Sequence, residues 1–111
     1  MTTEEQIRNA IKFHARREKE GNHNTFVLLG RDYKDLYSHT KNKIDLEKAE
    51  NYFTKAIESS QSDDNVRKIY YAERAEVSAT LGKNDDAIAD VIESHKIPGD
   101  AMSDSFVDFT C

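Results

Sequence analysis

The stretch DLEKAENYFTKAIESS, residues 45–60, places Ala49 and Ala56 on either side of Phe53. Its apolar residues recur every three or four positions, which is the spacing of one helix face. We expect Asp45 to cap this helix at its start. Small residues let two helix backbones approach closely, so Ala49 and Ala56 are predicted contact points between antiparallel helices, with Phe53 filling the space beside the crossing. The predicted buried stripe is Leu46, Ala49, Phe53, Ala56 and Ile57.

The composition favours one all-α domain. A chain of 111 residues is the size of a single domain. It has four glycines, one proline and no tryptophan, and such a scarcity of helix breakers predicts a mostly helical fold. The net charge of -5 disfavours binding to the phosphates of nucleic acids.

The sequence carries no sign of a membrane segment or an export signal. No apolar run approaches the roughly 18 residues that a membrane span needs, and the start, MTTEEQIRN, lacks the basic and apolar regions of a signal peptide. Cys111 is the only cysteine, so no intrachain disulfide can form. We therefore expect a soluble, cytoplasmic protein in a reducing compartment, with no membrane partner.

Five amphipathic helices are predicted along the chain. The first is capped by Thr3 and ends before Gly21, and the fourth ends at Gly82. The fifth starts at a cap on Asn84, and its predicted inward residues are Ala87, Ile88, Val91 and Ile92. The first four helices are expected over residues 3–20, 25–42, 45–60 and 66–81. The tail, 98–111, sustains no period; its Phe106, Val107 and Phe109 either dock on the helices or stay loose.

Two of these helix pairs share a pattern. Ala49 and Ala87 each follow two charged residues, and each pair begins with a helix that carries a tyrosine, Tyr33 or Tyr71. This arrangement resembles the tetratricopeptide repeat (TPR), a helix-turn-helix unit of about 34 residues with the pattern W-x2-L-G-x2-Y, A-x3-F and a closing proline. The match departs from the family where Ser94 replaces an alanine and where no proline closes the first pair.

The resemblance implies a TPR-like domain over residues 1–97 built from antiparallel helix hairpins. The first repeat would cover 30–60 and the second 64–97, with the first helix as an N-terminal cap and 98–111 as the C-terminal tail. Two repeats are fewer than the roughly three that such stacks need. Their ends must therefore be covered, either by the first helix and the tail or by a second copy in a homodimer.

The resemblance also implies a function, that of a non-catalytic adaptor binding a protein or peptide partner in a concave groove. Co-chaperones of this family hold a carboxylate with lysines and asparagines; Lys34 fits that role, but Ser38 and Glu73 stand where asparagines are expected. A peptide with apolar anchors and a basic residue near Glu73 and Glu76 is the better match. The groove residues that the resemblance assigns are Lys34, Ser38, Lys41, Ala72, Glu73, Glu76 and Thr80.

Other functions have weaker support in the sequence. Self-assembly as a homodimer through the repeat ends is one alternative, and a nucleic-acid or regulatory binder is another, using the basic residues of the first helix: Lys12, Arg16, Arg17 and Lys19. The four histidines lack the spacing of a metal site. Paired acids such as Asp85 and Asp86 fall at helix starts, where negative charge is favourable anyway. We therefore expect no catalysis, no metal and no cofactor.

Overall fold

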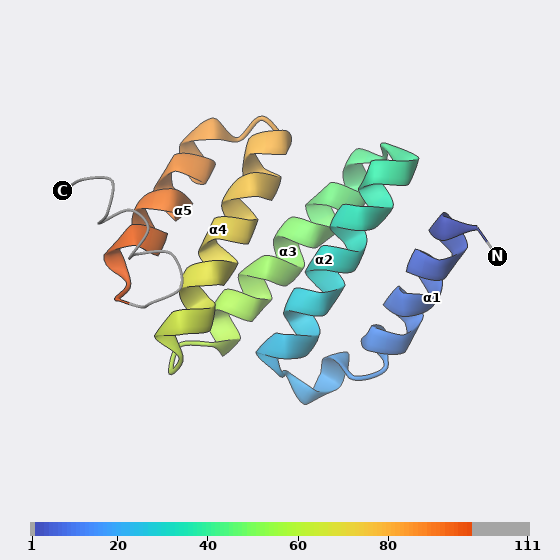
Figure 1. The fold of residues 1–111 in the computed structure, drawn as a ribbon, viewed down its shortest axis with the longest axis horizontal. Helices are drawn as coiled ribbons and strands as arrows, with labels where there is room; N and C mark the ends of the chain where they lie inside the picture. The colour runs from blue at the N-terminus through green and yellow to red at the C-terminus, as the bar shows by residue number, and fades with distance from the viewer. Residues whose placement is uncertain (1, 99–111) are drawn as a thin grey trace.

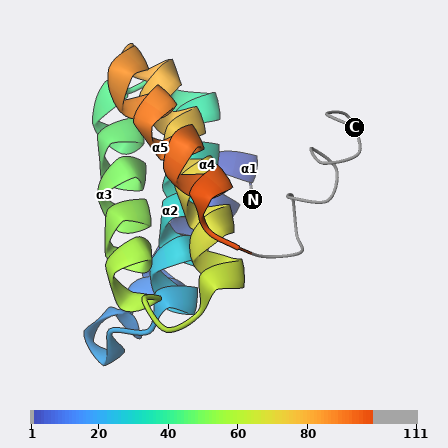
Figure 2. The ribbon, with the colours of Figure 1, turned by 90° about the vertical axis from the view of Figure 1, so that its left-hand side faces the viewer.

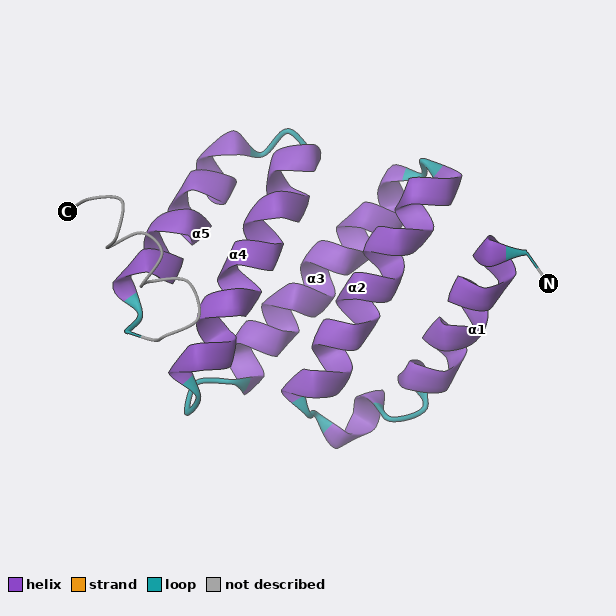
Figure 3. Cartoon of the chain, in the orientation of Figure 1, coloured by secondary structure: helices purple, strands orange, loops and turns teal. Residues whose placement is uncertain are grey.

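The computed structural model describes residues 2–98, which form five α-helices and no strand (Figures 1 and 3). The prediction of an all-α fold is confirmed. A short 3-10 helix, η1, lies between the first two α-helices. The elements are α1 (Thr3–Ala15), η1 (Glu18–Glu20), α2 (His23–Thr40), α3 (Lys43–Ser59), α4 (Asp64–Thr80) and α5 (Asn84–Lys96).

Each helix packs on the next one along the chain. The contacts are most extensive between α2 and α3 and between α4 and α5, and α1 on α2 and α3 on α4 complete the series. Successive helices alternate in direction, with α1 and α5 at opposite ends of the row (Figure 1). The view turned by 90° shows that α3 lies to one side of α2 and α4 (Figure 2). The molecule measures 49 × 30 × 22 Å along its principal axes.

The first helix is shorter than predicted. Thr2, not Thr3, caps α1, since its side chain accepts a hydrogen bond from the backbone N–H of Glu5 at 3.1 Å. The helix ends at Ala15, and η1 leads to Gly21 in the left-handed conformation (φ 69°). The charged run after Ala15 offers no apolar residue to hold it against α2, so the chain turns there instead of extending the helix to residue 20.

Two further caps differ from the sequence prediction. Asn42 caps α3 by accepting a hydrogen bond from the N–H of Ile44 at 3.0 Å, because α2 ends at Thr40 and the chain turns at once through Lys41 (φ 55°). Asp45 lies inside the helix, is only 8% exposed and accepts a hydrogen bond from the hydroxyl of Thr40 at 2.6 Å. In α5 the cap position is Lys83, which makes no side-chain capping bond.

The buried stripe predicted for α3 is confirmed. Ala49, Phe53 and Ala56 are 0% exposed, and Leu46 and Ile57 are nearly so. The ring of Phe53 lies against Gly30 of α2, where an added Cβ would stand 2.8 Å from ring atom Cε1. Gly30, which weakens α2 by its low helix propensity, therefore makes room for the largest fully buried side chain.

The inward face predicted for α5 is only partly correct. Ala87 is buried, but Ile88, Val91 and Ile92 are 58%, 43% and 48% exposed. Within residues 2–98 the one extensive contact of α5 is with α4, and the side of α5 in that contact carries Ala87, Asp90 and Ser94. The prediction is therefore wrong for Ile88, Val91 and Ile92, because among the described residues only the side of α5 with Ala87 has a helix to pack on.

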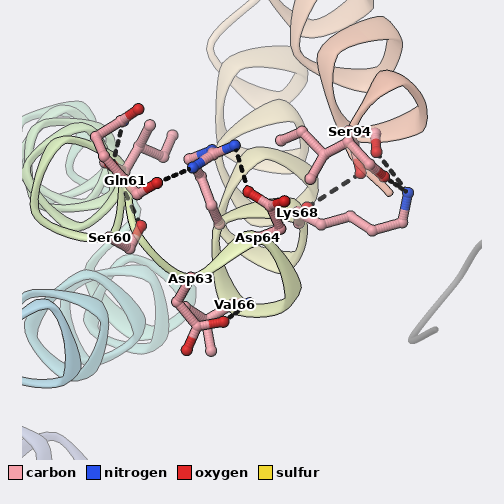
Figure 4. Close-up of polar contacts among 10 residues, drawn as sticks. Ser60, Gln61, Asp63, Asp64, Val66, Lys68 and Ser94 are labelled. Atoms are coloured by element: carbon pink, nitrogen blue, oxygen red, sulfur yellow. Dashed lines mark hydrogen bonds and ion pairs between the residues drawn. The ribbon is translucent and has the colours of Figure 1, made fainter. Parts of the chain in front are cut away.

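A buried lysine joins α4 to the end of α5 (Figure 4). Lys68 is 0% exposed, and its Nζ donates to the carbonyls of Ser94 at 2.5 Å and Ile97 at 3.1 Å. In return the hydroxyl of Ser94 donates to the carbonyl of Lys68 at 3.0 Å. A positive charge is favourable here because the C-terminal end of a helix carries partial negative charge. Ser94, a departure from the family pattern, thus has a structural role in holding α5 on α4.

Candidate functional site: the groove between α2 and α4

Three side-chain contacts bring α2 beside α4, although α3 separates them in sequence. Arg31 donates to both carboxylate oxygens of Glu73, with Nε–Oε1 at 2.7 Å and Nη2–Oε2 at 3.2 Å. One helical step further, Lys34 Nζ lies 2.7 Å from Glu76 Oε1. Near the start of α2, His23 Nδ1 lies 2.8 Å from the hydroxyl of Tyr70. The positive charges of these two ion pairs all come from α2, and the negative charges from α4.

Beyond these contacts the two helices leave a hollow of about 190 Å³, which we call the α2–α4 groove. Its apolar floor includes Leu46 and Val77, which are 2% and 1% exposed. Tyr37 forms part of one wall, and the Nζ of Lys41 lies 5.6 Å from the centre of its ring. The residues that line the groove are Lys34, Tyr37, Ser38, Lys41, Leu46, Glu76, Val77 and Thr80.

The structure brings most of the residues assigned by sequence to this one place. Lys34, Ser38, Lys41, Glu76 and Thr80 all line the α2–α4 groove. The remaining two lie outside its lining: Glu73 pairs with Arg31 beside the groove, and Ala72 lines a separate hollow between α4 and α5. Arg31, Tyr37 and the floor residues had no assigned role. Leu46 was predicted for the buried stripe of α3, whereas Val77 of α4 was assigned neither to the core nor to the groove.

Two ion pairs neutralise four of the charges at and beside the groove, whereas the amine of Lys41 stands over the ring of Tyr37. The hydrogen bond to Glu73 raises the pKa of Arg31, against the opposing effect of burial. Glu73 and Glu76 therefore each hold a cation of α2, and a basic residue of a partner must exchange with Arg31 or Lys34 to reach them. Such an exchange costs little, because exposed ion pairs contribute only about 0–1 kcal/mol each.

A larger hollow, of about 470 Å³, lies among α3, α4 and α5 and is strongly polar. Arg74 makes two hydrogen bonds to Asp90, at 2.8 and 2.6 Å, and a third to Thr54 at 3.1 Å. Lys83 Nζ lies 2.7 Å from Glu50 Oε1, and Glu50 also accepts from Ser78. Since these charges bind one another across three helices, the hollow is best explained as a polar network that fixes α5.

The basic residues predicted for the first helix lie mostly after its end at Ala15, beside an acidic side chain that is already paired within the chain. Arg16 and Lys19 line an open hollow beside Lys55 and Glu18. Glu18 accepts a hydrogen bond from the hydroxyl of Tyr52 at 2.8 Å and lies 3.7 Å from Lys55 Nζ. Arg17 stands over the exposed ring of Phe13 at 5.5 Å. No continuous basic stripe runs across this part of the described chain, so its geometry gives a nucleic-acid interface little support.

Over residues 2–98 no three acidic, histidine or cysteine side chains are grouped as metal ligands would be. Two of the histidines bind other side chains instead: His14 Nδ1 lies 2.6 Å from Asp32, and His23 contacts Tyr70. Burial raises the pKa of Asp32, although its hydrogen bond to His14 opposes the shift. In the same part of the chain, none of the helices combines the length and the apolar character of a membrane span.

Neither a protein-family model, nor a curated protein, nor a solved structure matches the chain. Support for a function therefore comes from the geometry of the groove.

Proposed function

We propose that the chain is a non-catalytic, TPR-like adaptor that binds a segment of a partner protein in the α2–α4 groove. The pairing of α2 with α3 and of α4 with α5, together with the direct contacts of α2 with α4, supports an assembly of two stacked hairpins. In such a stack the first helix of each pair lines the binding surface. The observation that carries the proposal is an apolar floor beneath a charged rim on these two helices.

The size of the groove favours a side chain over a small metabolite. At about 190 Å³ it is smaller than the roughly 300–1,000 Å³ of typical small-molecule sites. One apolar side chain of a partner would contact Leu46 and Val77, with Tyr37 against its flank. A basic residue next to this anchor would exchange with Arg31 or Lys34 at the carboxylates of α4. Helices already packed around the groove lose little entropy when the partner docks.

The test reverses the groove charges while keeping the ion pairs. One variant carries Arg31→Glu, Lys34→Glu, Glu73→Arg and Glu76→Lys, so that each acid still faces a base. A matched control swaps the exposed pair of α1, with Glu4→Arg and Arg8→Glu, whose Nε–Oε2 distance is 3.2 Å. Both variants must keep the helical circular dichroism of the wild type.

Wild type and variants are then used as bait in native lysate, and retained proteins are identified by mass spectrometry. We expect a partner that is retained by the wild type and the α1 control but lost by the groove variant. The binding segment is then mapped with synthetic peptides, and its affinity is measured by calorimetry. Equal retention of the same proteins by all three forms would exclude the α2–α4 groove as the binding surface.

A further inference from the structure

The free side of the α4–α5 pair is apolar and open. We call it the end face, and it forms a hollow of about 400 Å³. Its larger side chains are Ile88, Val91 and Ile92 of α5, each more than 40% exposed. The α4–α5 pair lies at the far end of the row from α1 (Figure 1). The residues that line the end face are Ala72, Ala75, Glu76, Ala79, Ala87, Ile88, Val91 and Ile92.

The shape of the end face indicates what it would accommodate. The α4 side consists mainly of alanines and the α5 side of branched residues, which leaves a trough along α4. Between α2 and α3, small residues leave a similar space beside Gly30, and the ring of Phe53 fills it. An occupant that supplies bulky, unbranched or aromatic side chains would fit the trough in the same way.

The chain itself provides such side chains directly after α5. Ile97 is buried, and its carbonyl is bound by Lys68, so the end of the described chain is held on α4. Residues 99–111 lie outside the described part of the chain. Their sequence includes Met102, Phe106 and Phe109. Fully extended they would reach about 40 Å, whereas α5, with 13 residues, is about 20 Å long.

We propose that residues 100–109 fold back over the end face and cover it with Met102, Phe106 and Phe109. These residues are spaced by four and three, the interval that aligns side chains on one helix face. Asp100, Asp104 and Asp108 recur every four residues and would lie on the outer side. A polar outer surface is what the terminal unit of a helical stack needs for solubility.

The connection along the chain favours this occupant over a second copy. A segment joined to α5 through Ile97 and Pro98 meets the end face at a high effective concentration, which for short linkers is in the millimolar range. A second copy would have to associate at the protein's own, lower concentration. The proposal does not depend on the α2–α4 groove, since the two surfaces share only Glu76, at the edge of each.

The single cysteine allows a test on the full chain without mutation. A nitroxide label on Cys111 broadens the NMR signals of nearby amides, and ¹⁵N-labelled protein reports which ones. A segment folding back from Ile97 brings the label toward the start of α5, so we expect the strongest signal loss around Ile88. Ile7 and Ile11 of α1 serve as internal controls and should keep their intensity. Full intensity at Ile88, Val91 and Ile92 would overturn the proposal.

A variant and a mixing experiment complete the test. Phe106→Ser with Phe109→Ser should abolish the broadening on α5, whereas Asp108→Ser, on the outer side, should leave it unchanged. In a second experiment, spin-labelled protein at natural isotope abundance is mixed 1:1 with ¹⁵N-labelled protein that carries no spin label. The ¹⁵N signals of this mixture should show no broadening. Broadening in that mixture, with a dimeric mass by sedimentation, would mean that a second copy covers the end face and would refute the proposal.

Discussion

Replacing Gly30 with alanine tests whether the contact between α2 and α3 depends on a missing side chain. In an isolated helix the change is stabilising, by about 0.8–1.0 kcal/mol, because alanine is the better helix former. Here the new methyl group would stand 2.8 Å from Cε1 and 2.9 Å from Cδ1 of Phe53. Real Cβ atoms do not approach other atoms this closely, and the ring is 0% exposed, so it has no free space to move into.

The two effects oppose each other, and the steric one is larger. Overpacking a close-packed core costs about 1–3 kcal/mol, so Gly30→Ala should lower the free energy of unfolding by about 1 kcal/mol overall. In a Phe53→Leu background the ring is absent, and the same substitution should instead stabilise by about 0.5–1 kcal/mol. The sign of the Gly30→Ala effect is thus predicted to reverse between the two backgrounds, and the difference is the coupling energy of the pair.

Urea unfolding followed by circular dichroism of the four proteins measures this cycle. Ala89→Gly, at an exposed position within α5, calibrates the propensity difference in this protein and should cost about 1 kcal/mol. If Gly30→Ala stabilises the Phe53 protein by as much as Ala89→Gly destabilises it, the close approach of α2 and α3 inferred here is incorrect.

Three further predictions concern buried and half-buried polar groups. Arg74→Gln leaves the carboxylate of Asp90, 7% exposed, without its two charged hydrogen bonds; urea unfolding should show a loss of about 3 kcal/mol, partly restored by Asp90→Asn. Lys68→Met leaves two carbonyls at the end of α5 unpaired, which should cost about 1–3 kcal/mol and speed amide exchange there. Burial and the hydrogen bond to Glu18 raise the pKa of Tyr52. A raised pKa stabilises the fold below pH about 10, and this contribution is lost at higher pH; melting temperatures from pH 8 to 11 should fall less steeply for Tyr52→Phe.

The spacing of apolar residues was enough to predict which residues of α3 are buried. The stripe from Leu46 to Ile57 was predictable because helical spacing assigns residues to one face regardless of what that face contacts. Helix starts were less predictable, since several polar residues near each start are able to cap. Asn42, not Asp45, caps α3 because α2 ends at Thr40 and only Lys41 separates it from Asn42. The position of this tight turn depends on the packing of α2 on α3.

Properties that depend on the packing of two helices could not be predicted from the sequence. By helix propensity alone, Gly30 only weakens α2; its role in packing is seen when the ring of Phe53 lies against it. Likewise, spacing puts Lys34, Ser38 and Lys41 near one another on α2, but it does not reveal that Glu76 neutralises Lys34. The exposure of Ile88 is the same kind of failure, because periodicity defines an apolar face without showing that a neighbour covers it.

The burial of Lys68 makes it a chemical reporter on the attachment of α5. An amine-reactive reagent needs access to Nζ, which is enclosed and bound to the carbonyls of Ser94 and Ile97. Exposed lysines such as Lys12 and Lys96 react from the folded state, whereas Lys68 must wait until α5 separates from α4. The labelling rate of Lys68 is compared with the rates of the exposed lysines. This ratio reports how often α5 separates from α4 while the rest of the molecule stays folded.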